Sequence, residues 1–282
     1  MDLSLFKSRN IVPAMRPARQ RDKAENRVLA VGSLPLLTLL LLPILALVLK
    51  TPPTTVLQYL GQPSTVQAIR LSLVTSTATA AIVVVLGLPL SYALARRRFR
   101  GKRLVEVLID LPTVLPPAVA GLALLMAFGR RGLVGGWLET LGIEIAFTPL
   151  AVMMAQMFVA APYYIKTAGV GLSSVSADLE RAAELDGAGR LEVLRYITLP
   201  LAWRGIAGGI ALCWARALGE FGATIMFAGN YPGRTQTMPL AVYLGFQIDL
   251  NQALTLGIIL LILSFGLLLT VRAILRDEPD TH

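Results

Sequence analysis

Residues 28–49 form a run of 22 residues without a charged side chain, and this run constrains the fold more than any other feature of the sequence. At 1.5 Å per residue, a helix of that length crosses about 30 Å of hydrocarbon. Five further apolar stretches are separated by short polar connectors, and they cover approximately residues 71–95, 104–128, 145–165, 205–229 and 253–271. The sequence therefore predicts an all-α integral membrane protein with six transmembrane helices.

The composition excludes several classes of function. Hydrophobic residues make up 55% of the chain and charged residues 15%, which excludes a water-soluble fold. Cys213 is the single cysteine and His282 the single histidine, so we expect no disulfide, no metal site and no catalytic Ser-His or Cys-His arrangement. The net charge of +9 could indicate nucleic acid, but the basic residues flank the apolar stretches and only Phe99 interleaves with them. We therefore expect no nucleic-acid partner.

The distribution of Lys and Arg predicts the orientation in the bilayer. With the amino end in the cytoplasm, the inner side holds 20 Lys and Arg residues and the outer side five, so the positive-inside rule places both termini in the cytoplasm. We expect a basic cytoplasmic tail over residues 1–27, a transmembrane domain over 28–275 and a cytoplasmic tail over 276–282. Residues 238–248 are too few to cross, so we expect an outer interfacial or re-entrant piece there.

Between the fourth and fifth stretches, the charged segment 178–204 predicts a helix, a turn and a second helix on the cytoplasmic surface. Asp178 and Glu180 suit the amino end of a first amphipathic helix, which Gly187 then breaks. A second run over 191–197 leads to Pro200, where we expect the chain to turn out of helical geometry. Read from helix chemistry alone, this segment is equally well a plain connector.

The same segment resembles the EAA signature of the membrane subunits of ABC importers, through Glu180-Arg181-Ala182-Ala183, Gly187 and Ile197-Thr198-Leu199-Pro200. In that family it is a coupling helix that docks in a groove of the cytoplasmic ATPase. Small side chains allow the helix to pack closely in the groove, and an acidic residue can pair with a basic residue of the partner. The resemblance implies that the residues that couple to the ATPase are Glu180, Ala182, Ala183, Gly187, Ile197, Leu199 and Pro200.

Two further regions resemble the molybdate and sulfate permeases, with the molybdate branch nearest. They are Asp110-Leu-Pro-Thr-Val-Leu-Pro-Pro-Ala-Val-Ala-Gly121 and Ala215-Arg-Ala-Leu-Gly-Glu-Phe-Gly-Ala-Thr224, the latter followed by Pro232-Gly-Arg-Thr-Gln-Thr-Met-Pro-Leu240. The resemblance implies a type I importer permease in the inner cell membrane. It also implies as partners a second permease copy, two ABC ATPase subunits and an extracytoplasmic oxyanion-binding protein.

The chain itself is expected to be non-catalytic. It has no Gly-x-x-x-x-Gly-Lys-Ser/Thr phosphate loop, so we expect no cofactor in this chain, with ATP and magnesium bound by the partner ATPase. Molybdate, tungstate and sulfate or thiosulfate all remain open as substrates. A stand-alone ion-coupled carrier is a further alternative.

Arg216 and Glu220 are four residues apart in the fifth predicted span. Two charges at a helix centre cost about 5–7 kcal/mol on insertion scales, which exceeds the roughly 2–4 kcal/mol that the apolar neighbours return. The pair must therefore face the bundle interior or a wet cavity, either as a structural ion pair or beside the substrate path. Prolines kink the third span and form either a plain bend or a gate. The candidate residues for pathway or structure are Arg216, Glu220, Gly219, Gly222, Pro116 and Pro117.

Overall fold

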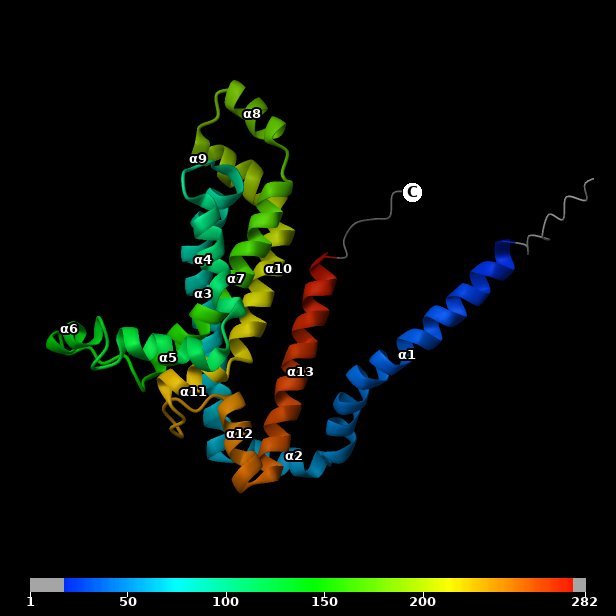
Figure 1. Ribbon diagram of the computed structural model, residues 1–282, viewed down its shortest axis with the longest axis vertical. Coiled ribbons are helices and arrows are strands. Elements are labelled where there is room, and N and C mark those ends of the chain that lie inside the picture. Colours follow the sequence, from blue (N-terminus) through cyan, green and yellow to red (C-terminus); the bar gives the residue numbers. More distant parts are fainter. Residues whose placement is uncertain (1–17, 276–282) are drawn as a thin grey trace, which may run out of the picture. The chain divides into compact units, whose positions relative to one another are not determined.

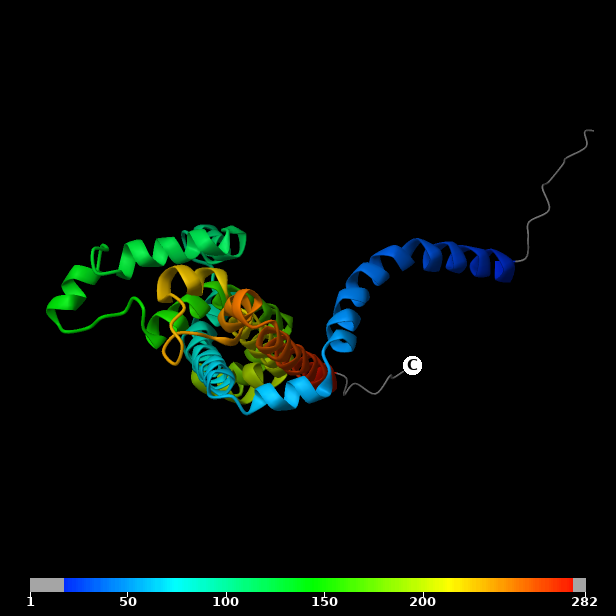
Figure 2. The same ribbon diagram turned by 90° about the horizontal axis from the view of Figure 1, so that it is seen from below.

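The computed structural model describes residues 18–275 and contains helices and no strand within that range (Figures 1 and 2). Residues 1–50 and 51–282 form separate units. In the first unit, α1 (Ala18–Lys50) contains the predicted span 28–49 and continues through Pro35 and Pro43. The part of α1 from Val31 to Lys50 is apolar and unburied. Most of the expected amino tail (1–17) and the tail 276–282 lie outside the described residues.

The second unit is a helical bundle whose carboxyl-terminal helix ends at the limit of the described chain (Figure 1). Its elements are α2 (Pro53–Leu60), α3 (Pro63–Arg96), α4 (Lys102–Val114), α5 (Pro117–Phe128), α6 (Gly135–Thr140), α7 (Pro149–Ser174), α8 (Ala177–Leu185), α9 (Arg190–Val193), the π-helix η1 (Leu194–Thr198), α10 (Leu199–Leu218), α11 (Gly222–Ala228), α12 (Met238–Ile248) and α13 (Leu250–Leu275).

Helix α7 is the centre of the bundle and packs mainly against α3 and α10. The ring of Tyr164 is fully buried between Gly87 of α3 and Gly209 of α10; a Cβ atom at either glycine would lie 2.9 and 3.2 Å from the ring, respectively. Near the α8 end of the bundle, α7 and α10 approach more closely still, because a Cβ atom at Gly171 would lie 2.7 Å from Gly205 Cα. Because these glycines have no side chain, the three helices can pack at short distances from one another.

A stripe of hydroxyl side chains on α3 joins it to α7 and α12. Thr79 Oγ1 donates to Gln156 Oε1 (3.0 Å), and Gln156 Nε2 donates to Thr75 Oγ1 (3.2 Å). The backbone N–H of Met238 donates to Ser72 Oγ (2.7 Å). These buried polar groups satisfy one another's hydrogen-bonding capacity, and they connect segments that are distant in the sequence.

Four of the described helices are long and apolar enough to cross a membrane, and the bent pair α4–α5 would make a fifth. The prediction of six spans counts α7 as well, which has sufficient length but is not among these apolar helices. Its environment explains the difference, because α7 is enclosed by other helices and needs less apolar surface than a helix facing lipid. The multi-pass architecture is confirmed, and the number six stays a prediction.

The predicted kink within residues 104–128 is present, and it divides this stretch into two helices. Helix α4 ends at Val114, and α5 follows after a bend of 115° (Figure 1). The cause is the Pro116-Pro117 pair, since a residue that precedes proline is driven into extended geometry. Leu115 has ψ 136° and Pro116 has ψ 132°, whereas Pro112 is accommodated inside α4.

The predicted span 205–229 is also interrupted. Helix α10 ends at Leu218 and α11 begins at Gly222, which leaves Glu220 outside either helix. Gly219, a poor helix former, follows the last residue of α10, and Phe221 adopts φ −126° and ψ −54°. Arg216 and Glu220, which the sequence places four residues apart in one predicted span, therefore do not belong to one continuous helix.

The expected turn at Pro200 is absent as well. Residues Arg190–Leu218 form one continuous helix, and both Thr198 and Leu199 have helical dihedral angles. In a regular α-helix the ring of Pro200 would clash with the carbonyl group of residue 196. The π-helix relieves this conflict, because the N–H of Leu199 donates to the carbonyl of Leu194, five residues earlier.

Candidate functional site: a docking surface and a helix break

The first predicted site is the segment that begins with α8. Ser176 caps this helix by accepting a hydrogen bond from the N–H of Asp178 (3.2 Å), and Asp178 and Glu180 occupy its first turn. Gly187 follows with φ +95°, a left-handed conformation that glycine adopts without strain. The predicted short helix and its glycine break are thus confirmed, while the second predicted helix merges into α10.

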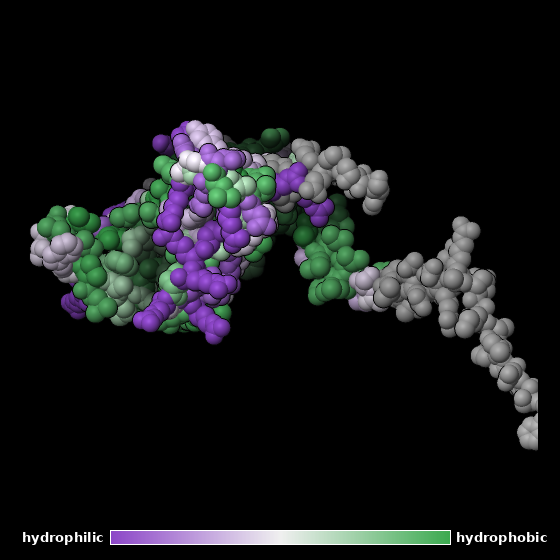
Figure 3. All heavy atoms as spheres, turned by 90° about the horizontal axis from the view of Figure 1, so that it is seen from above, coloured by the Kyte–Doolittle hydropathy of each residue, from purple (hydrophilic) through white to green (hydrophobic). Residues whose placement is uncertain are grey.

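The outer face of α8 is open. None of its nine residues is buried, and Leu179 and Leu185 are 52% and 89% exposed. Hydrophilic side chains otherwise dominate this end of the bundle (Figure 3). Among the other predicted coupling residues, Ala182 and Pro200 are exposed, whereas Ala183, Ile197 and Leu199 are half-buried. Leu179 and Leu185 are therefore accessible apolar side chains at the polar end of the bundle.

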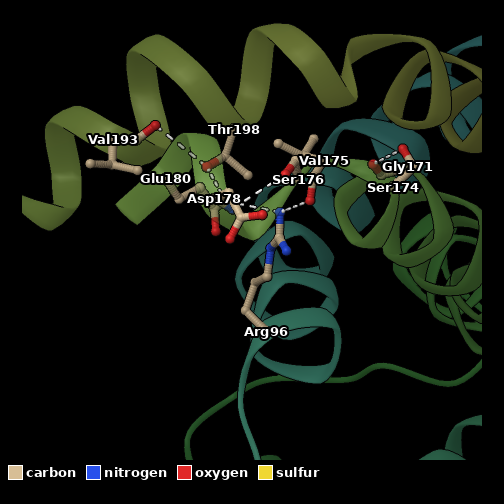
Figure 4. A network of polar contacts seen from close by, with 9 residues as sticks. All are labelled: Arg96, Gly171, Ser174, Val175, Ser176, Asp178, Glu180, Val193 and Thr198. Carbon is tan, nitrogen blue, oxygen red and sulfur yellow. Dashed lines mark hydrogen bonds and ion pairs between the residues drawn. The ribbon is translucent and has the colours of Figure 1, made fainter. Parts of the chain in front are cut away.

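Glu180, by contrast, points into the protein (Figure 4). Its Oε1 atom lies 2.9 Å from Nη2 of Arg96, the last residue of α3, and also accepts a hydrogen bond from Thr198 Oγ1 (2.7 Å). We expected this carboxylate to meet a basic residue of another subunit; its basic partner is in the same chain. Sequence reasoning missed Arg96 because it is one of six basic residues in a short connector, and nothing local marks it as different.

The second predicted site is the break between α10 and α11. Arg216 Nη1 lies 2.6 Å from Glu220 Oε2, and the other carboxylate oxygen, Oε1, accepts the backbone N–H of Ala223 (2.8 Å). The side chain of Glu220 is 1% exposed and that of Arg216 28% exposed. The inward orientation predicted from insertion energies is confirmed for Glu220. Its carboxylate caps the start of α11, a role that spacing alone did not reveal.

The two regions that resemble oxyanion permeases meet at this break. Gly222 packs on Pro117 so closely that a Cβ atom at Gly222 would lie 2.5 Å from Pro117 Cβ. One turn further along α5, a Cβ atom at Gly121 would lie 2.5 Å from the carbonyl oxygen of Ala223 in α11. Pro116 precedes α5 and Gly219 follows α10, so all six predicted pathway or structural residues lie at or next to the two helix breaks.

A third pair of opposite charges lies in the connector between α5 and α7. Arg130 pairs with Glu144 and, at 3.5 Å, with Glu139. The hydrogen bond from Arg130, assisted by its charge, holds the pKa of Glu144 below the ordinary value of a glutamate. Both side chains of this pair are more than half exposed.

Comparison with known proteins identifies the family. Residues 87–273 match the family described as binding-protein-dependent transport system inner membrane component. The molybdenum transport system permease protein ModB of Mycobacterium tuberculosis is 43% identical over 78% of this chain and 83% of its own length. The probable transport system permease protein NifC of Clostridium pasteurianum is 38% identical over 85% and 84%. A probable sulfate transport system permease protein, cysT of Nephroselmis olivacea, is 33% identical over 84% of each chain.

Solved structures agree on the fold. A chain of a bacterial alginate ABC transporter, solved with its periplasmic protein, superposes with a TM-score of 0.70 at 16% identity, covering 90% of this chain and 94% of that one. A chain of the methionine ABC transporter MetNI gives 0.55 at 18% identity, covering 74% and 95%. The chain belongs to the binding-protein-dependent transport system inner membrane components, and it is a multi-pass permease subunit of an ABC importer, of the molybdate and sulfate permease type.

Proposed function

We propose that this chain forms the membrane path of an ATP-driven oxyanion importer whose first substrate is molybdate. The observation that carries the proposal is the 43% identity, over 78% of the chain, to a protein named as a molybdenum permease. Two copies of the chain would enclose the path, with two ATPase subunits on the cytoplasmic side and an oxyanion-binding protein on the outer side. Tungstate, which shares the charge and shape of molybdate, is included in this proposal.

The surface of α8 supports the proposed coupling to the ATPase. Leu179 and Leu185 are exposed on a helix with no buried residue, so the helix has apolar surface available for a groove on another subunit. The chain has no phosphate-binding loop of its own, and ATP and magnesium belong to the partner. The chain itself is therefore non-catalytic in this proposal.

The proposed orientation has both termini in the cytoplasm, and single cysteines can test it. In a background without Cys213, cysteines at positions 98 and 185 should react only with a reagent on the cytoplasmic side, and one at position 235 only with a reagent outside. The first two positions are exposed and lie at the α8 end of the bundle, while position 235 is buried and needs a small reagent. Labelling of position 185 from outside would contradict the docking role of α8.

A sulfate or thiosulfate importer is the second candidate, supported by the 33% identity to the sulfate permease of Nephroselmis olivacea. The decisive experiment co-purifies the chain with its ATPase and binding protein in proteoliposomes. ATP hydrolysis is then measured with the binding protein loaded with molybdate, tungstate or sulfate. Stimulation by molybdate and tungstate supports the first proposal, and stimulation by sulfate alone supports the second. Membership of the family of binding-protein-dependent transport components argues against the remaining alternative, a stand-alone carrier.

A further inference from the structure

Arg96 connects elements that are far apart in the sequence (Figure 4). Its Nη2 atom pairs with Glu180 of α8 and donates a hydrogen bond to the carbonyl oxygen of Val175 (2.8 Å), the residue that follows α7. Thr198 of η1 completes the network by donating to the same Glu180 oxygen. One guanidinium and one carboxylate thereby join α3, the end of α7, α8 and η1.

This network holds α8 in place where apolar packing does not. None of the residues of α8 is fully buried, and Ala183 is its one half-buried hydrophobic residue, so burial of hydrophobic side chains anchors the helix only weakly. The side chains of Arg96 and Glu180 are only 15% and 16% exposed, and Thr198 is fully buried. A pair shielded in this way is weakened little by water and salt, in contrast to the exposed pair of Arg181 with Asp178 within α8.

The side chains of α8 therefore have different surroundings. Leu179 and Leu185 are exposed and free to contact another subunit, whereas Glu180 points to the bundle (Figure 4). Arg96 is the last residue of α3, a helix of 34 residues that is about 50 Å long. The arginine that holds α8 is therefore at one end of a long helix of the bundle. A displacement of α8 by a docked subunit is consequently passed to α3 through this ion pair.

The geometry points to Arg96 as the positioning residue that couples the movement of α8 to the transmembrane bundle during transport. This inference rests on the proposed docking of α8 to the ATPase. Arg96 makes no contact with substrate or nucleotide in this role. Its loss should separate ATP hydrolysis from transport without preventing assembly.

The experiment compares Arg96→Met with Arg97→Met in the complete transporter in proteoliposomes. Arg97 is the exposed neighbour and makes no ion pair with any part of the chain that the structure describes, so it is the matched control. We expect Arg96→Met to keep the ATPase bound and to reduce the molybdate transported per ATP at least tenfold. Arg96→Lys, which keeps the charge, should recover part of this ratio, and Arg97→Met should leave it unchanged.

The outcomes separate this inference from the proposed function. Absence of the ATPase from the unmodified complex would overturn the proposed function before any variant is made. An unchanged transport ratio in an assembled Arg96→Met complex would overturn the role of Arg96 alone. If Arg96→Met does not insert, Glu180→Gln removes the charge of the partner and keeps its shape. A normal ratio for Glu180→Gln, or failure of both variants to insert, assigns the pair to folding and refutes the inference.

Discussion

Glu180 and Glu220 use the same chemistry for different structural tasks. Each carboxylate meets an arginine and one further donor, but the partners of Glu180 come from α3 and η1, whereas those of Glu220 lie within four residues of it. The first arrangement fastens separate elements to one another. The second stabilises a local break inside the bundle, with the carboxylate 1% exposed. In the proposed coupling role an ion pair transmits movement because it joins separate elements, which the pair of Glu180 does and the pair of Glu220 does not.

The largest effect should come from unpairing Glu220. We expect Arg216→Met to destabilise the protein by about 3–5 kcal/mol, because an almost fully buried carboxylate loses its counter-charge. The double variant Arg216→Met, Glu220→Gln should recover most of this loss. Denaturant unfolding in detergent micelles measures the free energy of unfolding of the single and the double variant.

Transport by the double variant then distinguishes structure from pathway. Recovery of both folding and molybdate transport makes the pair structural. A stable double variant that hydrolyses ATP and transports nothing would make Arg216 a residue of the substrate path. Arg216, at 28% exposed, is the member of the pair that a passing anion could reach.

A smaller effect is expected at the other carboxylate. Thr198→Val removes the hydroxyl that donates to Glu180 and leaves the Arg96 pair intact, so we expect a loss of about 1.5–3 kcal/mol, typical of a hydrogen bond to a charged group. Thr77→Val on α3, whose hydroxyl accepts from Trp214 at an exposed position, is the matched control and should cost less. Equal losses for the two threonines would show that the Glu180 network is no stronger than a surface contact.

Two glycines allow the turn after α8 to be tested against an equivalent turn elsewhere. Gly187 and Gly101 have φ +95° and +85°, and a Cβ atom at either would meet no other atom within 4 Å. Alanine at each should therefore cost a similar strain of about 1 kcal/mol. Only Gly187→Ala should weaken binding of the ATPase. If the full strain of about 1 kcal/mol is lost from the binding free energy, the affinity for the ATPase falls about fivefold. An equal loss of ATPase binding in Gly101→Ala would argue against α8 as the docking element.

The smallest effect is expected at the exposed pair of Arg130 and Glu144. Because the pKa of Glu144 is lowered in the folded protein, its contribution to stability is present at neutral pH and is lost as the pH falls through that lowered pKa. Arg130→Gln should return the pKa toward 4.5, and Arg131→Gln should leave it unchanged. Carbon-13 NMR of labelled glutamate measures the shift. A pKa that stays low in Arg130→Gln would assign the effect to another group.

The sequence was informative wherever local physics decides the structure. Hydropathy predicted the membrane class, and the composition of residues 178–187 predicted α8 and the glycine that ends it. It failed at Pro200, because a π-helix accommodates a proline that an ordinary helix would not. It also failed at Glu220, where a single glycine and a capping carboxylate interrupt an apolar run that reads as continuous.

The partners of the candidate residues could be predicted only in part. Spacing brought Arg216 and Glu220 together, since they are four residues apart. No spacing rule joins Arg96 to Glu180, or Pro117 to Gly222, because these contacts depend on how α3, α5, α7 and α11 pack. Helix packing is set by many side chains at once, and a single sequence does not specify it position by position.

The close approach of Gly171 and Gly205 has a mechanical consequence. With no side chain between the two backbones, α7 and α10 are in direct contact near their ends. The segment α8–α9 links the same ends of these two helices (Figure 1). A force applied to that segment therefore acts on α7 and α10 together, at the ends where their backbones meet.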